Sequence, residues 1–417
     1  MKYLLVLITI IAFCSPFTSL ASPNQAHIEV KLEPAKKQFW CRYTLTVPAD
    51  AAESSVQLYL NKAFTILELK SAGAVQKKVS PVLYSLAQDT VQAIQLTYSP
   101  SKHRRQVVVT YRGTLPPKYA SPEVMELSGH SNWLPTRPFQ EYELIDYVLE
   151  AEAPASYHII SSSPPTRHTK TQSTFRGRTS AIEPTVIAAQ HMYQASTGTQ
   201  IPVHVFKAAT PLQHADSLLL TETEQVVAYY NGSIGKQDPI QRFSILLTGF
   251  DRDAFGLLDN ATVITYPDYD IRKRTDRLTL AHEISHKWWA YGSFSDYNDW
   301  LNEAFATYSS LLYLRATADT AGYRQELAKR VASAAGAPAI IGFIKAEHSY
   351  PMYRRVIYDK GTTVLAALHA RLGDAPFLAI LATTAARKTT TTQEFLTIVE
   401  QAAGLDTRQW LEKLLTT

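Results

Sequence analysis

The sequence predicts an α+β fold with two domains, a β-rich domain followed by an α-rich one. Apolar and polar residues alternate over much of the first half, which is the pattern of half-buried strands. The second half changes to the three- and four-residue spacing of amphipathic helices. The 417 residues are enough for two or three ordinary domains, and 46% of them are hydrophobic, which allows sizeable cores.

The first 21 residues are typical of a secretory signal. Lys2 precedes an apolar run at residues 3–13, and residues 19–21 (Ser-Leu-Ala) form a small-x-small cleavage site. We therefore expect an exported protein, periplasmic or extracellular after cleavage near Ala21. No later stretch reaches about 18 uninterrupted apolar residues, so we expect no stable membrane insertion. Cleavage leaves Cys41 as the only cysteine, which excludes an intramolecular disulfide.

Residues 22–205 are expected to form the β-rich domain, with a sandwich-like arrangement of sheets. Alternating apolar residues predict strands at residues 28–32, 39–47 and 107–111. Turn-rich patches such as residues 161–166 separate such segments, and the pattern contains no convincing helix of three turns. This half is therefore predicted to be β-sheet.

Residues 206–417 are expected to form an α-rich domain with a small sheet. Residues 212–230 have helical spacing, whereas residues 243–248 and 261–266 have the composition of strands. Nearly everything after Arg274 is predicted to be helical. Near the end of the chain, a Thr-x-x-Glu capping box predicts the start of another helix.

The charge balance argues against nucleic acid as a partner. The chain has 41 Lys and Arg residues against 37 Asp and Glu residues, a net charge of +4. Binding to a phosphate backbone requires a concentrated positive field, which so small an excess does not supply. We expect no nucleic-acid partner, and the sequence leaves the oligomeric state open.

A metal-binding pattern lies in the second domain. On a helix, His282 and His286 lie four residues apart and share one face, so both imidazoles can reach one cation. Glu283 projects beside them, where it can act on a water molecule. This is the H-E-x-x-H arrangement of zinc sites, although two exposed histidines on an amphipathic helix would have the same spacing.

A second predicted helix offers a third metal ligand. Glu303 follows His286 by 17 residues and lies one turn into a helix that begins near Trp300. Two histidines and one carboxylate leave an open position on a tetrahedral ion, which hydrolysis requires and a structural zinc lacks. We expect one Zn²⁺ ion per chain, although this ligand set does not exclude cobalt or manganese. Asp299 and Asn302 are candidates for orienting the histidines.

The segments around these residues form an ordered set of motifs. Residues 282–289 read His-Glu-Ile-Ser-His-Lys-Trp-Trp, residues 300–308 read Trp-Leu-Asn-Glu-Ala-Phe-Ala-Thr-Tyr, and residues 356–361 read Val-Ile-Tyr-Asp-Lys-Gly. Together they resemble the H-E-x-x-H-Q-W-[FW], W-L-N-E-G-F-A-x-Y and Y-x-K-G motifs of the aminopeptidase N family of zinc metallopeptidases, which are gluzincins. The resemblance is strong over roughly residues 206–417 and only architectural before them.

This resemblance implies a fold and a set of roles. Residues 206–417 would form a thermolysin-like catalytic domain, in a short form that lacks the C-terminal helical domain of longer relatives. Glu283 would be the general base and then the general acid, and Tyr358 would donate a hydrogen bond to the transition state. The substrate would be a peptide, hydrolysed by metal-activated water.

One part of the resemblance is altered. Gly256, Asp259 and Asn260 stand where the family has its G-[AG]-M-E-N signature, whose glutamate binds the free α-amine of the substrate. Asp259 keeps the charge on a shorter side chain, and displacements near 1 Å are costly at a reacting site. We therefore predict an aminopeptidase with altered recognition of the N-terminal amine, in which these three residues bind substrate. A peptidase that needs no free N-terminus and a zinc-binding protein without catalysis are the alternatives.

Overall fold

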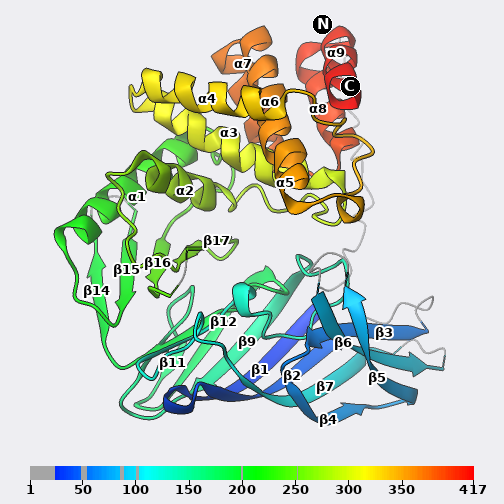
Figure 1. The fold of residues 1–417 in the computed structure, drawn as a ribbon, viewed down its shortest axis with the longest axis vertical. Coiled ribbons are helices and arrows are strands. Elements are labelled where there is room, and N and C mark those ends of the chain that lie inside the picture. Colours follow the sequence, from blue (N-terminus) through cyan, green and yellow to red (C-terminus); the bar gives the residue numbers. More distant parts are fainter. Residues whose placement is uncertain (1–23, 48–53, 85–88, 100–102, 199–200, 251) are drawn as a thin grey trace, which may run out of the picture.

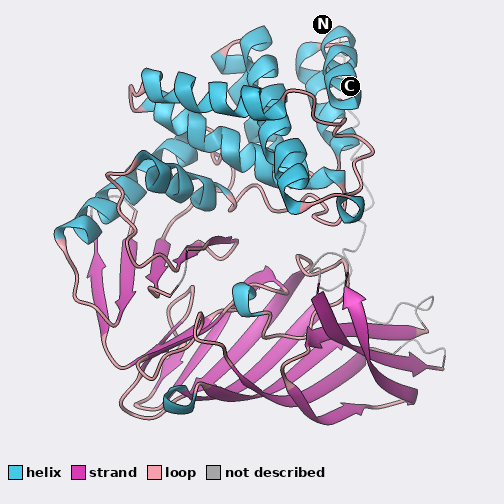
Figure 2. Ribbon diagram, viewed as in Figure 1, coloured by secondary structure: helices cyan, strands magenta, loops and turns pink. Residues whose placement is uncertain are grey.

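The computed structural model describes residues 24–417, except residues 48–53, 85–88, 100–102, 199–200 and 251. The predicted signal at residues 1–21 lies outside the described residues, so export stays a prediction. The predicted α+β fold with two domains is confirmed, because strands fill the first part of the chain and helices fill most of the second (Figures 1 and 2).

A seven-stranded sheet is the largest element of the β-rich domain, with the strand order β11-β12-β9-β1-β2-β7-β4. Its strands are β1 (Asn24–Glu33), β2 (Gln38–Val47), β4 (Thr65–Ser71), β7 (Arg105–Thr114), β9 (Leu144–Glu152), β11 (Arg167–His168) and β12 (Gln172–Ser180). Only β1 and β9 pair in parallel. The strands predicted from alternation are confirmed by β1, β2 and β7, since every second residue of β1 and β2 is buried.

Two smaller sheets complete this domain. One has the order β3-β6-β5 and the other has the order β10-β13-β8. Their strands are β3 (Ser55–Asn61), β5 (Ala74–Tyr84), β6 (Asp89–Tyr98), β8 (Val124–Leu127), β10 (His158–Ile160) and β13 (Val186–Ala189), with short 3₁₀ turns η1 (Pro34–Lys36) and η2 (Gly129–Ser131). Buried side chains of all three sheets, such as Tyr43, Leu58 and Val186, belong to one hydrophobic core.

The second domain begins with a five-stranded sheet of order β14-β15-β16-β18-β17. Its strands are β14 (Met192–Ser196), β15 (Val203–Ala208), β16 (Phe243–Leu247), β17 (Ala254–Leu257) and β18 (Ala261–Ile264). The three central strands are parallel, and the edge strands β14 and β17 are antiparallel to their neighbours. The domain break expected near residue 206 falls inside β15. Because β14 and β15 pair with this sheet, the change of domain comes between β13 and β14.

Helices form the rest of the second domain, above the β-rich domain in Figure 1. They are α1 (His214–Gly232), α2 (Arg274–Ser285), α3 (Trp300–Ala316), α4 (Thr320–Ala334), α5 (Tyr350–Tyr353), α6 (Gly361–Leu372), α7 (Asp374–Ala386), α8 (Thr392–Ala403) and α9 (Leu405–Thr416), with short turns η3 (Tyr297–Asp299), η4 (Lys345–Glu347) and the π-helical η5 (Arg354–Lys360). The predicted capping box is present, since the Thr391 hydroxyl accepts from the Glu394 N–H at 3.2 Å at the start of α8. Among the described helices, none has the length and apolar character needed to cross a membrane.

The helix α3 lies at the centre of the helical core. Nearly all of residues 300–314 are buried, and Glu303 is the partly exposed exception. The helix α6 approaches α3 closely, because a Cβ atom on Gly361 would lie 2.5 Å from the Cβ atom of Ala304. This close approach places the turn η5, which directly precedes α6, against α3.

Candidate metal centre and active site

The helix α2 presents two of the predicted metal ligands on one face. Leu280, Ala281 and Ile284 are fully buried beneath the helix, because they form its apolar face. His282 lies in the last turn, and His286 follows directly after the last helical residue. The structure brings the two imidazoles together, with 3.2 Å between their Nε2 atoms.

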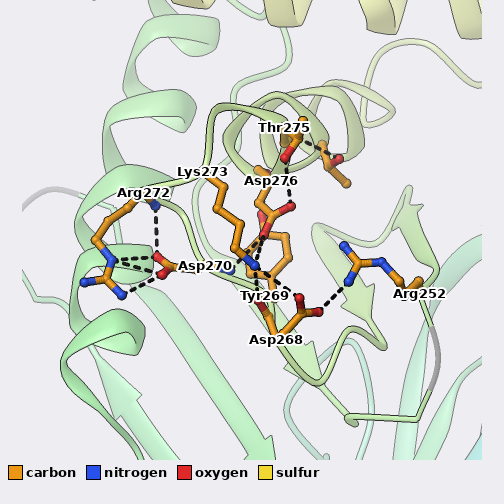
Figure 3. A network of polar contacts seen from close by, with 9 residues as sticks. Arg252, Asp268, Tyr269, Asp270, Arg272, Lys273, Thr275 and Asp276 are labelled. Carbon is orange, nitrogen blue, oxygen red and sulfur yellow. Dashed lines mark hydrogen bonds and ion pairs between the residues drawn. The ribbon is translucent and has the colours of Figure 1, made fainter.

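Polar contacts fix the start of this helix (Figure 3). The buried carboxylate of Asp276, in the first turn of α2, accepts a hydrogen bond from the backbone N–H of Asp270 at 2.9 Å. Lys273 and Arg252 both pair with Asp268, at 3.1 and 2.7 Å. Because Arg252 lies just before β17, these contacts connect the edge of the sheet to the helix that carries the histidines.

Glu303 of α3 completes the cluster. Its Oε2 atom lies 3.3 Å from Nε2 of His282 and 3.9 Å from Nε2 of His286. The three ligand atoms all lie within 4.8 Å of one another, and no other set of three potential ligands in the described part of the chain does so. This carboxylate oxygen is buried and has no hydrogen-bond partner among the described residues.

These distances and charges fit a zinc ion. Two nitrogen ligands about 2.0–2.1 Å from a tetrahedral zinc lie roughly 3.3 Å apart, close to the separation seen here. Burial disfavours ionisation of Glu303, but His282 and His286 outweigh burial and lower its pKa to about 2. At neutral pH the cluster therefore offers one negative charge, and a cation would satisfy the buried oxygen that lacks a partner.

Neighbouring groups orient the two imidazoles. His286 donates through Nδ1 to the carbonyl oxygen of Trp289 at 2.8 Å, which leaves its Nε2 atom available for a metal. Nδ1 of His282 lies 3.4 Å from the hydroxyl of Thr307, one turn after Glu303 on α3. Sequence reasoning missed both partners, because a backbone carbonyl has no side-chain signal and a threonine inside a helix is common.

Asp299 and Asn302, which we expected to orient the histidines, instead bond to each other and to neighbouring residues. Asn302 donates to Oδ1 of Asp299 at 3.0 Å, and Tyr353 donates to Oδ2 of Asp299 at 2.6 Å. Burial raises the pKa of Asp299 to about 6. Asn302 also donates to the carbonyl oxygen of Gly292 at 2.9 Å. These residues hold the loop before α3, and through it the position of α3.

Glu283 lies beside the metal ligands and is held by β17. One of its carboxylate oxygens accepts a hydrogen bond from the backbone N–H of Gly256 at 2.8 Å and lies 4.0 Å from Nε2 of His286. A Cβ atom on Gly256 would lie 2.3 Å from the carbonyl oxygen of Glu283, so only glycine fits there without a shift of the backbone. We predicted that Gly256 contacts the substrate. What the structure shows is a contact between Gly256 and the predicted base, Glu283.

Tyr358 lies across the cluster on η5. Its ring is nearly parallel to that of His282, with an angle of 8° and 6.2 Å between the ring centres. Burial raises the pKa of Tyr358 well above its ordinary value, so the hydroxyl stays protonated and able to donate at neutral pH. The guanidinium of Arg354 lies over the same ring, 4.1 Å from its centre.

One cavity of about 630 Å³ joins these groups. The three predicted ligands, the predicted base, Tyr358 and Gly256 all line it. It is also lined by the acidic residues Glu183, Asp253, Asp299 and Glu326, and by the basic residues Arg252, Arg330, Lys345 and Arg354. Asp253 directly precedes β17, which packs against α2, whereas three of the basic residues lie on α4, η4 and η5 beyond α3.

The structure does not bring Asp259 and Asn260 to this cavity. The carboxylate of Asp259 accepts hydrogen bonds from the Tyr147 hydroxyl at 3.1 Å and the Ser162 hydroxyl at 3.0 Å, both in the β-rich domain. Asn260 adopts a left-handed backbone, φ +57°, in the turn between β17 and β18. Neither residue lines the cavity, because β17 ends at Leu257 and the chain then turns toward the other domain.

Two imidazoles and a carboxylate, with a glutamate and a tyrosine beside them in a cavity, define a hydrolytic metal centre rather than a structural one. Residues 257–414 match the Peptidase family M1 domain. The chain therefore carries an M1 peptidase domain and is a zinc metallopeptidase. This confirms the resemblance to the aminopeptidase N family that the motifs predict.

Solved structures share the whole two-domain fold. An M1 zinc metallopeptidase from Deinococcus radiodurans, solved as a mutant bound to a Tyr-Ser-Ala substrate, is 18% identical with a TM-score of 0.69, over 94% of each chain. A two-domain M1 zinc metallopeptidase mutant bound to L-arginine is 19% identical with a TM-score of 0.73, over 94% of this chain and 93% of that one. None of the curated proteins compared matches this sequence.

Proposed function

We propose that this chain is an exported aminopeptidase that holds one zinc ion and recognises the N-terminal amine of its substrate in an altered way. The observation that carries the proposal is the cavity that contains the three metal ligands together with Glu283 and Tyr358. Export is supported by the signal pattern of residues 1–21 alone.

The residues around the cluster have separate roles in hydrolysis. His282, His286 and Glu303 would hold the zinc ion, which when bound polarises a carbonyl group and makes water more acidic. Glu283 takes a proton from the attacking water and passes it to the departing amine. Tyr358 donates a hydrogen bond to the carbonyl oxygen as negative charge develops on it.

Two carboxylates near β17 support altered recognition of the amine. Glu183, from the β-rich domain, lines the cavity and accepts a hydrogen bond from the backbone N–H of Leu258 at 3.3 Å. Asp253 lines the same region. Together they offer negative charge to a substrate ammonium, whereas Asp259 is held by Tyr147 and Ser162.

A peptidase that needs no free N-terminus is the second candidate. The observation in its favour is that the carboxylate of Asp259, at the position of the family's amine-binding glutamate, does not line the cavity. Such an enzyme would use the same ligands, base and tyrosine and would differ only in substrate choice.

Mass spectrometry of a mixed peptide pool, half of it N-acetylated, separates these functions. Stepwise loss of N-terminal residues from free peptides only is expected for the aminopeptidase. Cleavage of the acetylated half would favour the second candidate, and no cleavage would leave a zinc-binding protein without catalysis. Glu283→Gln serves as the inactive blank, and the exposed Glu347→Gln, outside the cavity, as its matched control.

A further inference from the structure

One cation in the cavity has no part in the hydrolysis described above. Arg354 lines the cavity next to Tyr358, with its guanidinium carbon 4.1 Å from the centre of that ring. Its one hydrogen bond in the described structure is a long contact of 3.5 Å from Nη1 to the Tyr350 hydroxyl. Within the described residues, no carboxylate forms an ion pair with it.

The other cations that line the cavity are paired. Arg330 donates to Asp359 at 2.6 Å, and Lys345 lies 3.6 Å from the carboxylate of Asp299. The fourth cation, Arg252, pairs with Asp268 outside the cavity. Arg354 is thus the cavity-lining arginine or lysine that forms no ion pair with a carboxylate among the residues that the structure describes, although Glu303 is near enough to raise its pKa.

Outside the metal cluster, the lining carboxylates Asp299 and Glu326 pair with Lys345 and Lys329, so the lining charges without a lysine, arginine or carboxylate partner of opposite sign among the described residues are two carboxylates and one arginine. Glu183 and Asp253 lie near β17, Arg354 lies on η5, and the metal ligands on α2 and α3 lie between them. A free peptide carries the matching charges, an ammonium at one terminus and a carboxylate at the other. The cavity would hold both termini of a peptide only if the peptide were short.

We propose that Arg354 binds the C-terminal carboxylate of the substrate, so that this enzyme acts on short peptides whose free carboxylate lies within about two residues of the scissile bond. This inference rests on the proposed peptidase function. An extended residue spans about 3.3–3.6 Å, so a carboxylate one or two residues beyond the carbonyl that faces Tyr358 lies within reach of its neighbour Arg354. The planar fork of arginine matches a carboxylate with two parallel hydrogen bonds.

The same contact would select against longer or blocked peptides. In a longer chain a neutral peptide group takes the place of the carboxylate, and the ion pair is lost. Because Arg354 is exposed, water screens this ion pair, and its loss should change affinity by about two- to fivefold. If Arg354 only stacked on Tyr358 and oriented its ring, its loss would affect acids and amides equally.

Binding to the zinc-loaded Glu283→Gln protein tests this assignment without turnover. Isothermal titration calorimetry would compare trialanine with trialanine amide, which differ only at the C-terminus. We expect Arg354→Gln to weaken binding of the acid by about two- to fivefold and to leave binding of the amide unchanged. The matched control is Arg324→Gln, an exposed arginine on α4 outside the cavity. Equal weakening of both ligands, or of neither, would overturn the assignment.

A second variant and a turnover assay complete the test. Arg354→Lys keeps the charge but not the fork, so it should retain part of the preference for the acid, and it replaces Arg354→Gln if that variant does not fold. Wild-type protein that cleaves acid and amide equally well would remove the role of Arg354 while leaving the peptidase function intact. If the wild-type protein cleaves nothing but its binding of the acid still depends on Arg354, the proposed peptidase function is wrong. The assignment of Arg354 as a carboxylate-binding residue then still holds.

Discussion

Tyr358 and Glu283 face the same cavity but are held there by different means. The phenol is partly buried beside His282 and keeps its proton, because desolvation raises its pKa. The carboxylate is held by a backbone N–H of Gly256, at 2.8 Å. Tyr358 is thus always able to donate a hydrogen bond, and Glu283 is an acceptor whose direction is fixed. These are the properties that a transition-state donor and a general base require.

Replacing the tyrosine should therefore slow the reaction without removing the metal. We expect Tyr358→Phe to lower kcat by about 100- to 1000-fold, because one donor to the developing negative charge is lost. KM and zinc content should change little, since the ring still packs beside His282. Steady-state kinetics with metal analysis checks this, with Tyr193→Phe on β14, away from the cavity, as the control. An unchanged kcat would mean that Tyr358 does not contact the reacting carbonyl.

The third ligand should decide whether metal binds at all. Glu303→Gln removes the negative charge that lies 3.3 Å from Nε2 of His282, so we expect dialysed protein to hold much less than one zinc ion per chain. Metal that binds only the folded protein stabilises it, by about 2.7 kcal/mol at a free concentration of 100 times Kd. Added zinc should accordingly raise the Tm of the metal-free wild type and of Glu347→Gln, but not that of Glu303→Gln. A zinc-dependent rise in the variant would show that Glu303 is not a ligand.

The edge strand β17 and the helix α2 act as one unit. Gly256 has no side chain, which allows the strand to approach the backbone of Glu283 and to donate to its carboxylate. The contacts of Arg252, Asp268 and Lys273 hold the two elements from the outside. The direction of the base therefore depends on strand packing as well as on the helix.

A single methyl group should disturb this unit. Gly256→Ala would place a Cβ atom 2.3 Å from the carbonyl oxygen of Glu283, so β17 must move away from α2. We expect a loss of about 1–3 kcal/mol of stability. We also expect kcat to fall by at least about tenfold, because the base loses its orientation. Urea unfolding and kinetics measure the two effects, and Gly198→Ala, with open space around it, is the control. Wild-type behaviour would show that the strand adapts easily.

The geometry and position of η5 cannot be predicted from the pattern of apolar residues. The motif around Tyr358 is visible in the sequence, but its π-helical geometry is not, because apolar spacing does not distinguish a widened turn from an α-helix. The position of η5 follows from Gly361, whose missing side chain lets α6 approach Ala304. That contact joins residues far apart in the chain, so no local pattern indicates it.

The sequence predicts the structure correctly where local spacing determines geometry. The strands at residues 28–32 and 39–47 and the helix at residues 212–230 follow from periodicity, and the placing of His282 beside His286 follows from helical geometry. The sequence does not predict which side chains meet where the two domains contact each other. Glu183 in the cavity and the partners of Asp259 depend on how the domains dock, which no motif encodes.

The docked position of Asp259 makes the domain contact dependent on pH. Burial raises its pKa above the ordinary value of 3.8, although Ser162 and Tyr147 donate to it. Between the unfolded and folded pKa values the folded protein binds more protons, so this contribution to stability is complete below the unfolded pKa and is lost as pH rises through the folded one. Asp259→Asn can accept the same hydrogen bonds and does not titrate. Its stability relative to wild type should therefore increase as pH rises through the acid range and stay constant near neutral pH.

Urea unfolding midpoints between about pH 3.5 and 7 would measure this difference across the range in which carboxylates titrate. Asp268→Asn is the matched control, because Arg252 and Lys273 lower the pKa of the exposed Asp268. Its wild-type contribution is present above the unfolded pKa and is lost as pH falls, so its difference from wild type should change in the opposite direction. Parallel pH profiles for wild type and Asp259→Asn would mean that the carboxylate is solvated, and that β17 and the turn after it are not fastened to the β-rich domain through this residue.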